Sequence, residues 1–239
     1  DGIANTQTNN LTLKVLGTAP DPIRLGVHTA NQFSIVVREI DALPEKKTVF
    51  LNTFGDQRFS THNAAIGKAL ILADYLTAVK HILETHPPAQ DLIVQHLEEH
   101  PADGLGALKH VNLKLLQLYI HAYQSLLWNN LVTSLPNPPE IIPIVGFGSN
   151  PGDQYVKEQL KNENLTPRNF VLKSFPELSE EGTERNTTLT LSDLHISKLE
   201  ADELHVGKHK TTITFSLPPG SYATEILKQL FNANPQEPS

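Results

Sequence analysis

The 239-residue sequence contains no cysteine. This absence excludes a disulfide framework, a thiolate zinc site and a cysteine nucleophile. Long hydrophobic runs are also absent: the longest are short stretches such as 141–145, whereas a helix needs about 20 apolar residues to cross a bilayer. Residues 1–5 have neither the basic region nor the apolar core of a secretory signal. The simplest interpretation is a cytoplasmic protein without a membrane segment.

Methionine is missing as well, and the chain begins at Asp1. Ordinary composition gives roughly five Met in a chain of this length. We therefore expect the printed chain to be incomplete, with residues missing before Asp1 and single Met residues missing at unmarked places. Spacings between motifs are then short by one residue wherever a Met is missing.

Positive charge is scarce: the chain has 19 Lys and Arg against 26 Asp and Glu, which gives a net charge of −7. Proteins that bind nucleic acids usually gather Lys and Arg against the phosphates. A local basic patch remains compatible with an acidic total, so the net charge argues against an RNA ligand without excluding one. Hydrophobic residues (39%) and charged residues (19%) occur in the proportions of an ordinary globular protein. The length allows one large domain or two smaller ones.

Hydrophobic periodicity predicts both strands and helices. Alternating or β-branched residues predict strands at 11–15, 33–38 and 211–217. Apolar residues at helical spacing predict helices at 63–84, 91–99 and 111–135, each followed by proline. A closing helix is expected at 221–231, with Ser221 as its N-cap. Between residues 136 and 207 the pattern indicates short strands, turns and polar loops.

Histidines raise the possibility of a metal site. His96 and His100 have the i, i+4 spacing that can hold zinc on a helix, and His81, His86 and His110 are near in sequence. A zinc hydrolase also needs the Glu of His-Glu-x-x-His, but Leu97 follows His96. We therefore interpret them as solvent-facing helix residues and predict no metal.

Two further enzyme motifs are incomplete. Gly148-Ser149-Asn150 lacks the Gly-x-Ser-x-Gly elbow of a serine hydrolase. The glycine-rich segment 146–152 lacks the Lys-Ser/Thr of a phosphate-binding loop. The segment is interpreted as turns.

The most informative segment is Asn52-Thr53-Phe54-Gly55-Asp56-Gln57-Arg58-Phe59, which has no apolar period. Composition alone favours a strand end leading into a helix, although glycine also permits close approach of a ligand and an exposed Phe can stack on a nucleobase. The segment resembles the Asn-x-Phe-Gly-x-Gln-Arg-Phe block of the TruD family of tRNA pseudouridine synthases. A second block, residues 215–224, resembles the same family and follows in the family's order about 160 residues later. Weaker matches at 23–39, 119–129 and 165–185 extend the resemblance over nearly the whole chain.

The resemblance implies a catalytic aspartate in a Lys-Asp-x-x-Ala-x-Thr-x-Gln motif. Asp1, Ala4 and Thr6 are in register with this motif, and Gln7 comes one position early. One missing residue before Gln7 restores the pattern, so Asp1 is the expected catalytic residue; without the resemblance it is a frayed terminal residue. The family's basic N-terminal segment, with its Lys, has no counterpart in the printed chain.

The implied activity is isomerisation of a uridine in tRNA to pseudouridine, with tRNA as partner and neither metal nor organic cofactor. The resemblance implies that Asn52 positions the catalytic Asp1, that Phe54 stacks on the flipped uracil, and that Arg58 contacts phosphate or lowers the pKa of Asp1. Tyr222 and Thr224 are expected to line the same cleft. Two alternatives stay open: Arg58 as a surface ion pair and Tyr222 as a packing residue.

The resemblance also implies an α+β fold, with a mixed, mainly antiparallel sheet and helices. Residues 1–75 and 208–239 would form the catalytic domain, with its N-terminal part missing, and residues 76–207 the insertion domain. The rival interpretation is a non-catalytic RNA-binding or scaffolding relative. For the enzyme, basic residues should gather at the cleft and four acids should turn away from it. The basic residues are Arg24, Arg58, Lys68, Arg168, Lys173 and Arg185; the acids are Glu98, Glu99, Glu180 and Glu181.

Overall fold

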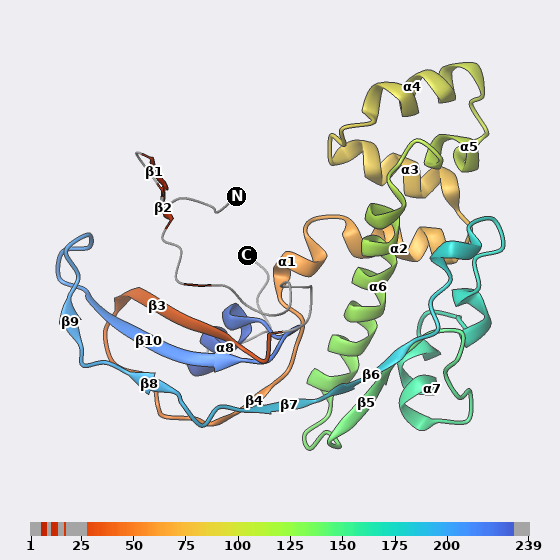
Figure 1. Cartoon of the computed structure of the whole chain (residues 1–239). Helices are drawn as coiled ribbons and strands as arrows, with labels where there is room; N and C mark the ends of the chain where they lie inside the picture. The colour runs from red at the N-terminus through yellow and green to blue at the C-terminus, as the bar shows by residue number, and fades with distance from the viewer. Residues whose placement is uncertain (1–5, 9–10, 14–16, 18–27, 232–239) are drawn as a thin grey trace.

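The computed structural model describes residues 6–8, 11–13, 17 and 28–231, and its elements form a sheet-containing body and a helical body (Figure 1). Two-stranded ribbons run between the bodies. Helices and antiparallel strands are mixed along the chain, which confirms the predicted α+β class.

The main sheet is built on two long antiparallel strands, β3 (Asn31–Ile40) and β10 (His209–Leu217). β10 also pairs with the short strands β8 (His195–Ile196) and β9 (Glu200–Ala201). Every second residue of β10 is buried, because alternate side chains of a strand point to opposite faces. The buried face packs against α8 (Ala223–Leu230) through Ile226 and Leu230. The predicted strands at 33–38 and 211–217 are therefore confirmed.

The helical body is organised around the 22-residue helix α6 (Leu113–Ser134), which packs along α2 (Asn63–Ile71). A side chain on Gly67 of α2 would collide with the carbonyl oxygen of Tyr119 on α6, so glycine allows the two helices to approach closely. The same core contains residues of both helices and of the flanking elements. These elements are α3 (Tyr75–Glu84), α4 (Gln90–Glu99), α5 (Gly104–Leu108), η1 (Pro167–Phe170) and η2 (Pro176–Leu178).

Two ribbons connect the bodies. β4 (Val49–Leu51) pairs with β7 (Thr188–Thr190), and β5 (Ile141–Ile144) pairs with β6 (Thr183–Asn186). β6 and β7 follow one another closely in sequence, so one segment serves both ribbons (Figure 1). A separate hairpin is formed by β1 (Thr6–Thr8) and β2 (Leu11–Leu13). No helix in the described part of the chain is long and apolar enough to span a membrane.

Three predicted elements differ from the structure. The helix expected at 63–84 is two helices, because Ala73 has a left-handed backbone (φ 57°) and the Asp74 side chain caps α3. The loop region 136–207 contains an additional helix, α7 (Gln154–Lys161), which is capped by the Asp153 carboxylate. The N-cap of α8 is Tyr222 rather than Ser221. The predicted domain boundaries remain a prediction, although α2 shares its core with α6.

Asp202 anchors the loop between β9 and β10 to β3. Its carboxylate, fully buried as a side chain, pairs with Arg38 at 2.7 Å and accepts a hydrogen bond from His205 at 2.8 Å. Burial alone raises the pKa of Asp202, but the hydrogen bonds from His205, from the Leu204 and Glu39 amides and from Arg38 bring it well below its ordinary value. The ionised carboxylate therefore stabilises the folded state.

We expect Asp202→Asn to lower the melting temperature at neutral pH. The contribution of Asp202 is complete above the unfolded pKa of about 3.9 and is lost as the pH falls towards the depressed folded value. Thermal melts of the wild type should thus lose stability below about pH 4 more steeply than melts of Asp202→Asn. Glu45→Gln, a change of an exposed carboxylate, serves as the control. Equal melting temperatures for Asp202→Asn and the wild type at pH 7 would contradict the prediction.

Candidate functional site

The Asn52–Phe59 segment leaves β4 and leads into the short helix α1 (Asp56–Phe59). Asn52 is 7% exposed; its backbone N–H donates to the Thr187 carbonyl at 2.8 Å, and its side-chain amide donates to the Asn186 carbonyl at 3.0 Å. Asn129 of α6 forms a paired contact with the backbone of Phe54, donating to its carbonyl and accepting from its N–H, both at 2.9 Å. The segment is therefore fixed by the ribbon on one side and by α6 on the other.

Phe54 is 8% exposed and lies in an aromatic cluster. Trp128 contacts it edge-to-face at a centroid distance of 5.8 Å, and Tyr222 contacts it at 6.1 Å. The guanidinium of Arg185 lies 3.9 Å from the ring centroid, a close cation–π contact. One face of Phe54 is thus covered by a positive charge.

Arg185, on β6, joins the two sequence blocks. Its Nε donates to the Asn52 carbonyl at 2.9 Å, and its Nη2 donates to Oδ1 of Asn52 at 2.7 Å and to the Gly220 carbonyl at 3.1 Å. Ser221 also donates to Oδ1 of Asn52, at 3.3 Å. The Asn52 segment and the turn that follows β10 therefore meet at one guanidinium, although about 170 residues separate them.

The pKa of Arg185 is lowered to about 10, chiefly by burial; Tyr222 acts in the opposite direction, and the nearby charge of Arg58 adds to the lowering. At neutral pH the side chain remains protonated. Within residues 28–231 no carboxylate forms an ion pair with Arg185. The site thus holds a partly buried positive charge beside an aromatic ring.

A pocket of about 300 Å³ opens beside Phe54. Its wall includes Arg58 and Arg185, and also the carboxylates Glu180 and Glu184. Burial alone raises the pKa of Glu180, but hydrogen bonds from His121 (2.8 Å) and Gln117 (3.1 Å) bring it below its ordinary value. Glu180 is therefore an anion in the pocket wall. The expectation that its side chain turns away from the cleft is wrong.

The structure brings together most of the site residues expected from the sequence. Asn52, Phe54 and Tyr222 are neighbours, and Nε of Arg58 donates to Ser125 of α6 at 3.3 Å in the same pocket wall. Asn52 and Tyr222 lie next to Phe54 but do not line this pocket, and Thr224, exposed on α8, does not line it either. Asp1 lies outside the described residues. The catalytic and binding roles of these residues remain predictions.

A second, larger pocket of about 510 Å³ borders the first. The two share residues 182–184 of the β6 segment. The larger pocket is lined by the loop 148–153 and α7, and none of the expected site residues contributes to it. The larger pocket is therefore connected to the Asn52 segment only through the shared residues of the β6 segment.

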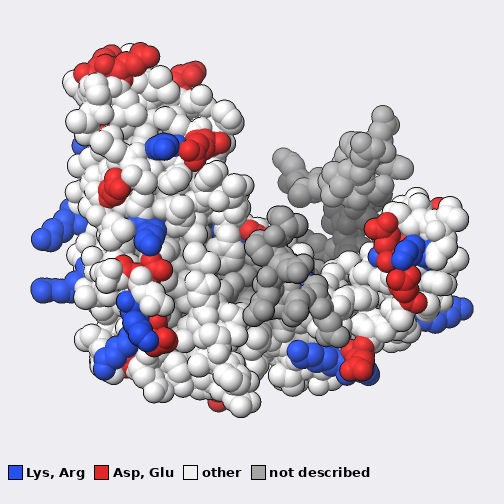
Figure 2. Space-filling view, turned by 180° about the vertical axis from the view of Figure 1, so that it is seen from behind, with Lys and Arg blue, Asp and Glu red and all other residues white. Residues whose placement is uncertain are grey.

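Charge on the described surface is mixed rather than segregated. Figure 2 shows Lys and Arg interspersed with Asp and Glu over the helical body, and acidic atoms gathered at its far end. Lys68, expected at the cleft, pairs with Glu163 at 2.6 Å. Arg24 lies outside the described residues. The basic contribution to the pocket wall thus comes from Arg58 and Arg185.

Three of the five histidines considered as metal ligands, His96, His100 and His110, have their rings close together. The rings of His100 and His110 lie 5.2 and 5.5 Å from that of His96, which contacts Asp103 at 3.1 Å. His100 and His110 are exposed, as expected, whereas His96 is partly covered.

Comparison with known proteins identifies similar sequences and a similar structure. The sequence profile of the family "tRNA pseudouridine synthase D (TruD)" matches residues 1–92, 89–137 and 141–230. A Methanopyrus kandleri protein named "Probable tRNA pseudouridine synthase D" is 27% identical over 97% of this chain and 72% of its own length. A protein of the same name from Methanococcoides burtonii is 24% identical, over 98% and 76% of the two chains.

A crystal structure described as "the Putative tRNA pseudouridine synthase D (TruD) from Methanosarcina mazei" has the same fold. It superposes with a TM-score of 0.74 and covers 93% of this chain and 73% of its own. The sequence identity is 22%, so this likeness bears on the fold alone.

Proposed function

Because the chain belongs to the tRNA pseudouridine synthase D (TruD) family, we propose that it isomerises a uridine of tRNA to pseudouridine. The observation that carries this proposal is the junction of the two family blocks at Arg185, beside a pocket that Phe54 lines. A pocket of about 300 Å³ is at the lower end of the range for small-ligand sites, a size suited to a nucleobase. A cytoplasmic location remains a prediction from the sequence.

The reaction breaks the bond between C1′ of the ribose and N1 of uracil and forms a bond between C1′ and C5. The proton on C5 is lost and N1 gains one, so atoms balance within the substrate and solvent. No electrons are exchanged with an outside group, and the chemistry needs no redox cofactor. A carboxylate can serve either as nucleophile at C1′ or as base at the neighbouring carbon. We assign this carboxylate to Asp1.

The described residues would bind and orient the base. A uridine has to leave its helical stack before an enzyme can act on it, and aromatic side chains receive such flipped bases. Phe54 would contact the uracil face without hydrogen bonds that hinder its rotation. The guanidinium of Arg185, 3.9 Å from the ring centroid, would restrain the Phe54 ring. Asn52, whose amide is bonded to Asn186 and to Arg185, would position the aspartate.

We expect Phe54→Leu to lower kcat/KM for tRNA by about 5- to 150-fold, since stacking on a base contributes about 1–3 kcal/mol by alanine substitution. Leucine keeps most of the buried volume but has no aromatic face, so the variant should fold. Phe147→Leu, a change of an exposed ring, is the matched control. An unchanged kcat/KM for Phe54→Leu would contradict the stacking role.

The rival candidate is a non-catalytic RNA-binding relative, and one observation favours it. Glu180 and Glu184 lie in the pocket wall with the two arginines, and acidic groups repel RNA phosphates. Incubation of the full-length protein with unmodified tRNA transcripts, followed by mass-spectrometric detection of pseudouridine, separates the two candidates. Conversion supports the enzyme; tRNA binding without conversion supports the non-catalytic relative.

A further inference from the structure

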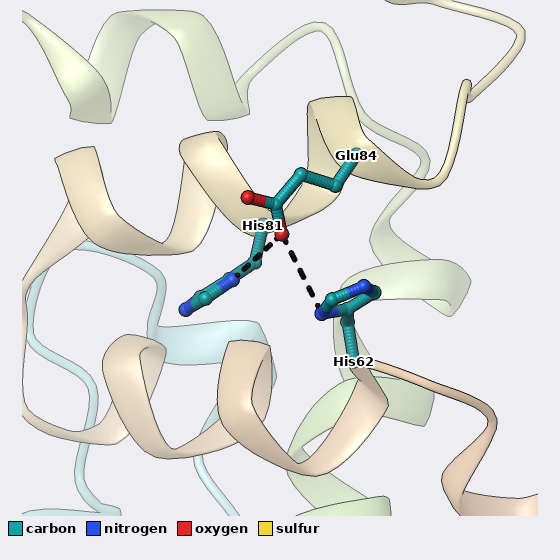
Figure 3. Close-up of side chains that lie close together, drawn as sticks. All are labelled: His62, His81 and Glu84. Atoms are coloured by element: carbon teal, nitrogen blue, oxygen red, sulfur yellow. Dashed lines mark hydrogen bonds and ion pairs between the residues drawn. The ribbon is translucent and has the colours of Figure 1, made fainter.

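Three potential metal ligands come together outside the pocket, where α2 begins next to α3. His62 is the N-cap residue of α2, and His81 and Glu84 lie one turn apart on α3 (Figure 3). One carboxylate oxygen of Glu84 lies 3.0 Å from Nδ1 of His81 and 3.5 Å from Nδ1 of His62. The two imidazole rings are nearly parallel, with centroids 5.6 Å apart. Two nitrogens and one oxygen thus lie close together, with the Glu84 oxygen between the two Nδ1 atoms.

The spacing of these atoms fits a small divalent ion. One ligand atom from each residue lies within 4.8 Å of the other two. Ligands of tetrahedral zinc are about 2.0–2.1 Å from the ion, and hence roughly 3.4 Å from one another. The side chains of His62, His81 and Glu84 are 30%, 28% and 42% exposed, so each has room to rotate toward that separation.

We propose that His62, His81 and Glu84 bind a divalent transition-metal ion, with zinc as the preferred ion. Two imidazoles and a carboxylate are a donor set that suits zinc, and the exposed side of the trio allows water to be the fourth ligand. The ion would take the place of the hydrogen bond between His81 and Glu84, on the side where Nδ1 of His62 approaches. This site is distinct from the His96 cluster, whose Asp103 already caps α5 through the Gly106 amide at 2.8 Å.

Bound zinc would stabilise the junction between α1 and α2. His62 precedes Asn63, whose side-chain amide donates to the Arg58 carbonyl at 3.2 Å. Arg58 lies in the wall of the Phe54 pocket. An ion that ties His62 to α3 would therefore restrain the segment that carries Arg58, without contacting the substrate.

The test is zinc binding by the full chain, freed of metal with EDTA and dialysed. Isothermal titration with Zn²⁺ should find a site of one-to-one stoichiometry, and Co²⁺ in its place should give the visible absorption of a tetrahedral ion. Zinc at about a hundred times its Kd should raise the melting temperature by about 5–10 °C. His81→Gln and Glu84→Gln should weaken zinc binding at least about tenfold, because each removes a ligand.

Two matched variants identify the residues responsible. His86→Asn removes a neighbouring exposed histidine, and asparagine tolerates its positive φ of 50°. His96→Gln alters the other histidine cluster. Both should bind zinc like the wild type, and melts in EDTA should show that all variants fold. Three outcomes would overturn the proposal: equal zinc affinity in Glu84→Gln and the wild type, a loss of binding confined to His96→Gln, or no binding to the wild type. The group would then be a hydrogen-bonded His81–Glu84 pair with His62 beside it.

Discussion

Replacing Asp1 by Asn in the full-length protein is expected to abolish the conversion of uridine in tRNA. Asparagine keeps the shape and most of the hydrogen bonding of aspartate but cannot act as a nucleophile or base. Loss of an essential nucleophile or its partner typically lowers kcat by roughly ten-thousand-fold or more. Single-turnover conversion, measured by mass spectrometry of the tRNA, gives the rate. tRNA affinity and the melting temperature should stay close to those of the wild type.

A carboxylate elsewhere on the chain provides the control for Asp1. Asp91 is exposed at the start of α4, far from the pocket wall, and Asp91→Asn should convert tRNA normally. An Asp1→Asn variant that retains activity would end the assignment of Asp1. Loss of tRNA binding together with activity would instead indicate a binding role for this residue.

Arg185→Lys is expected to lower kcat by roughly a hundredfold, the cost of a small misplacement of reacting groups. Lysine keeps the positive charge but lacks the planar fork, so it cannot bond Asn52 twice and Gly220 at once. Its flexible ammonium also makes a poorer cover for the Phe54 ring. Asn52 and Phe54 would then lose their fixed geometry while the charge of the pocket is preserved.

The separate effects on kcat and on KM show whether Arg185 positions the site residues or only supports folding. Arg185→Lys should lower kcat with KM for tRNA little changed, and the loss should persist at temperatures well below its melting transition. Arg168→Lys, at an exposed arginine on η1, should behave like the wild type. If the activity of Arg185→Lys falls only in proportion to its unfolded fraction, Arg185 stabilises the fold and does not position the site.

Local periodicity predicted the long elements well. α6 and β10 were found because their apolar residues repeat over many positions with a single period. The break between α2 and α3 was missed, since it depends on an alanine in a left-handed conformation, where glycine is the usual signal. α7 was missed because its eight residues bury few apolar side chains, chiefly Val156 and Leu160.

The candidate site depended on resemblance and on contacts distant in sequence. Asn52 and Phe54 belong to a recognisable block, whereas Arg185 ends a weaker match and was predicted only as a basic residue near the cleft. Its central position arises from contacts with Asn52 and Gly220, which no local pattern reveals. The pairing of His81 with Glu84 follows from helical spacing, but the approach of His62 depends on the turn between α2 and α3.

The shared segment 183–190 has a mechanical consequence. Its first half pairs with β5 beside α6, and its second half pairs with β4 beside the main sheet. Asn52 is bonded to Asn186 and Thr187, at the midpoint between these two attachments. A bend between the two bodies would therefore have its pivot at Asn52, so that closing the protein around an RNA would move this residue least and the distant ends of both bodies most.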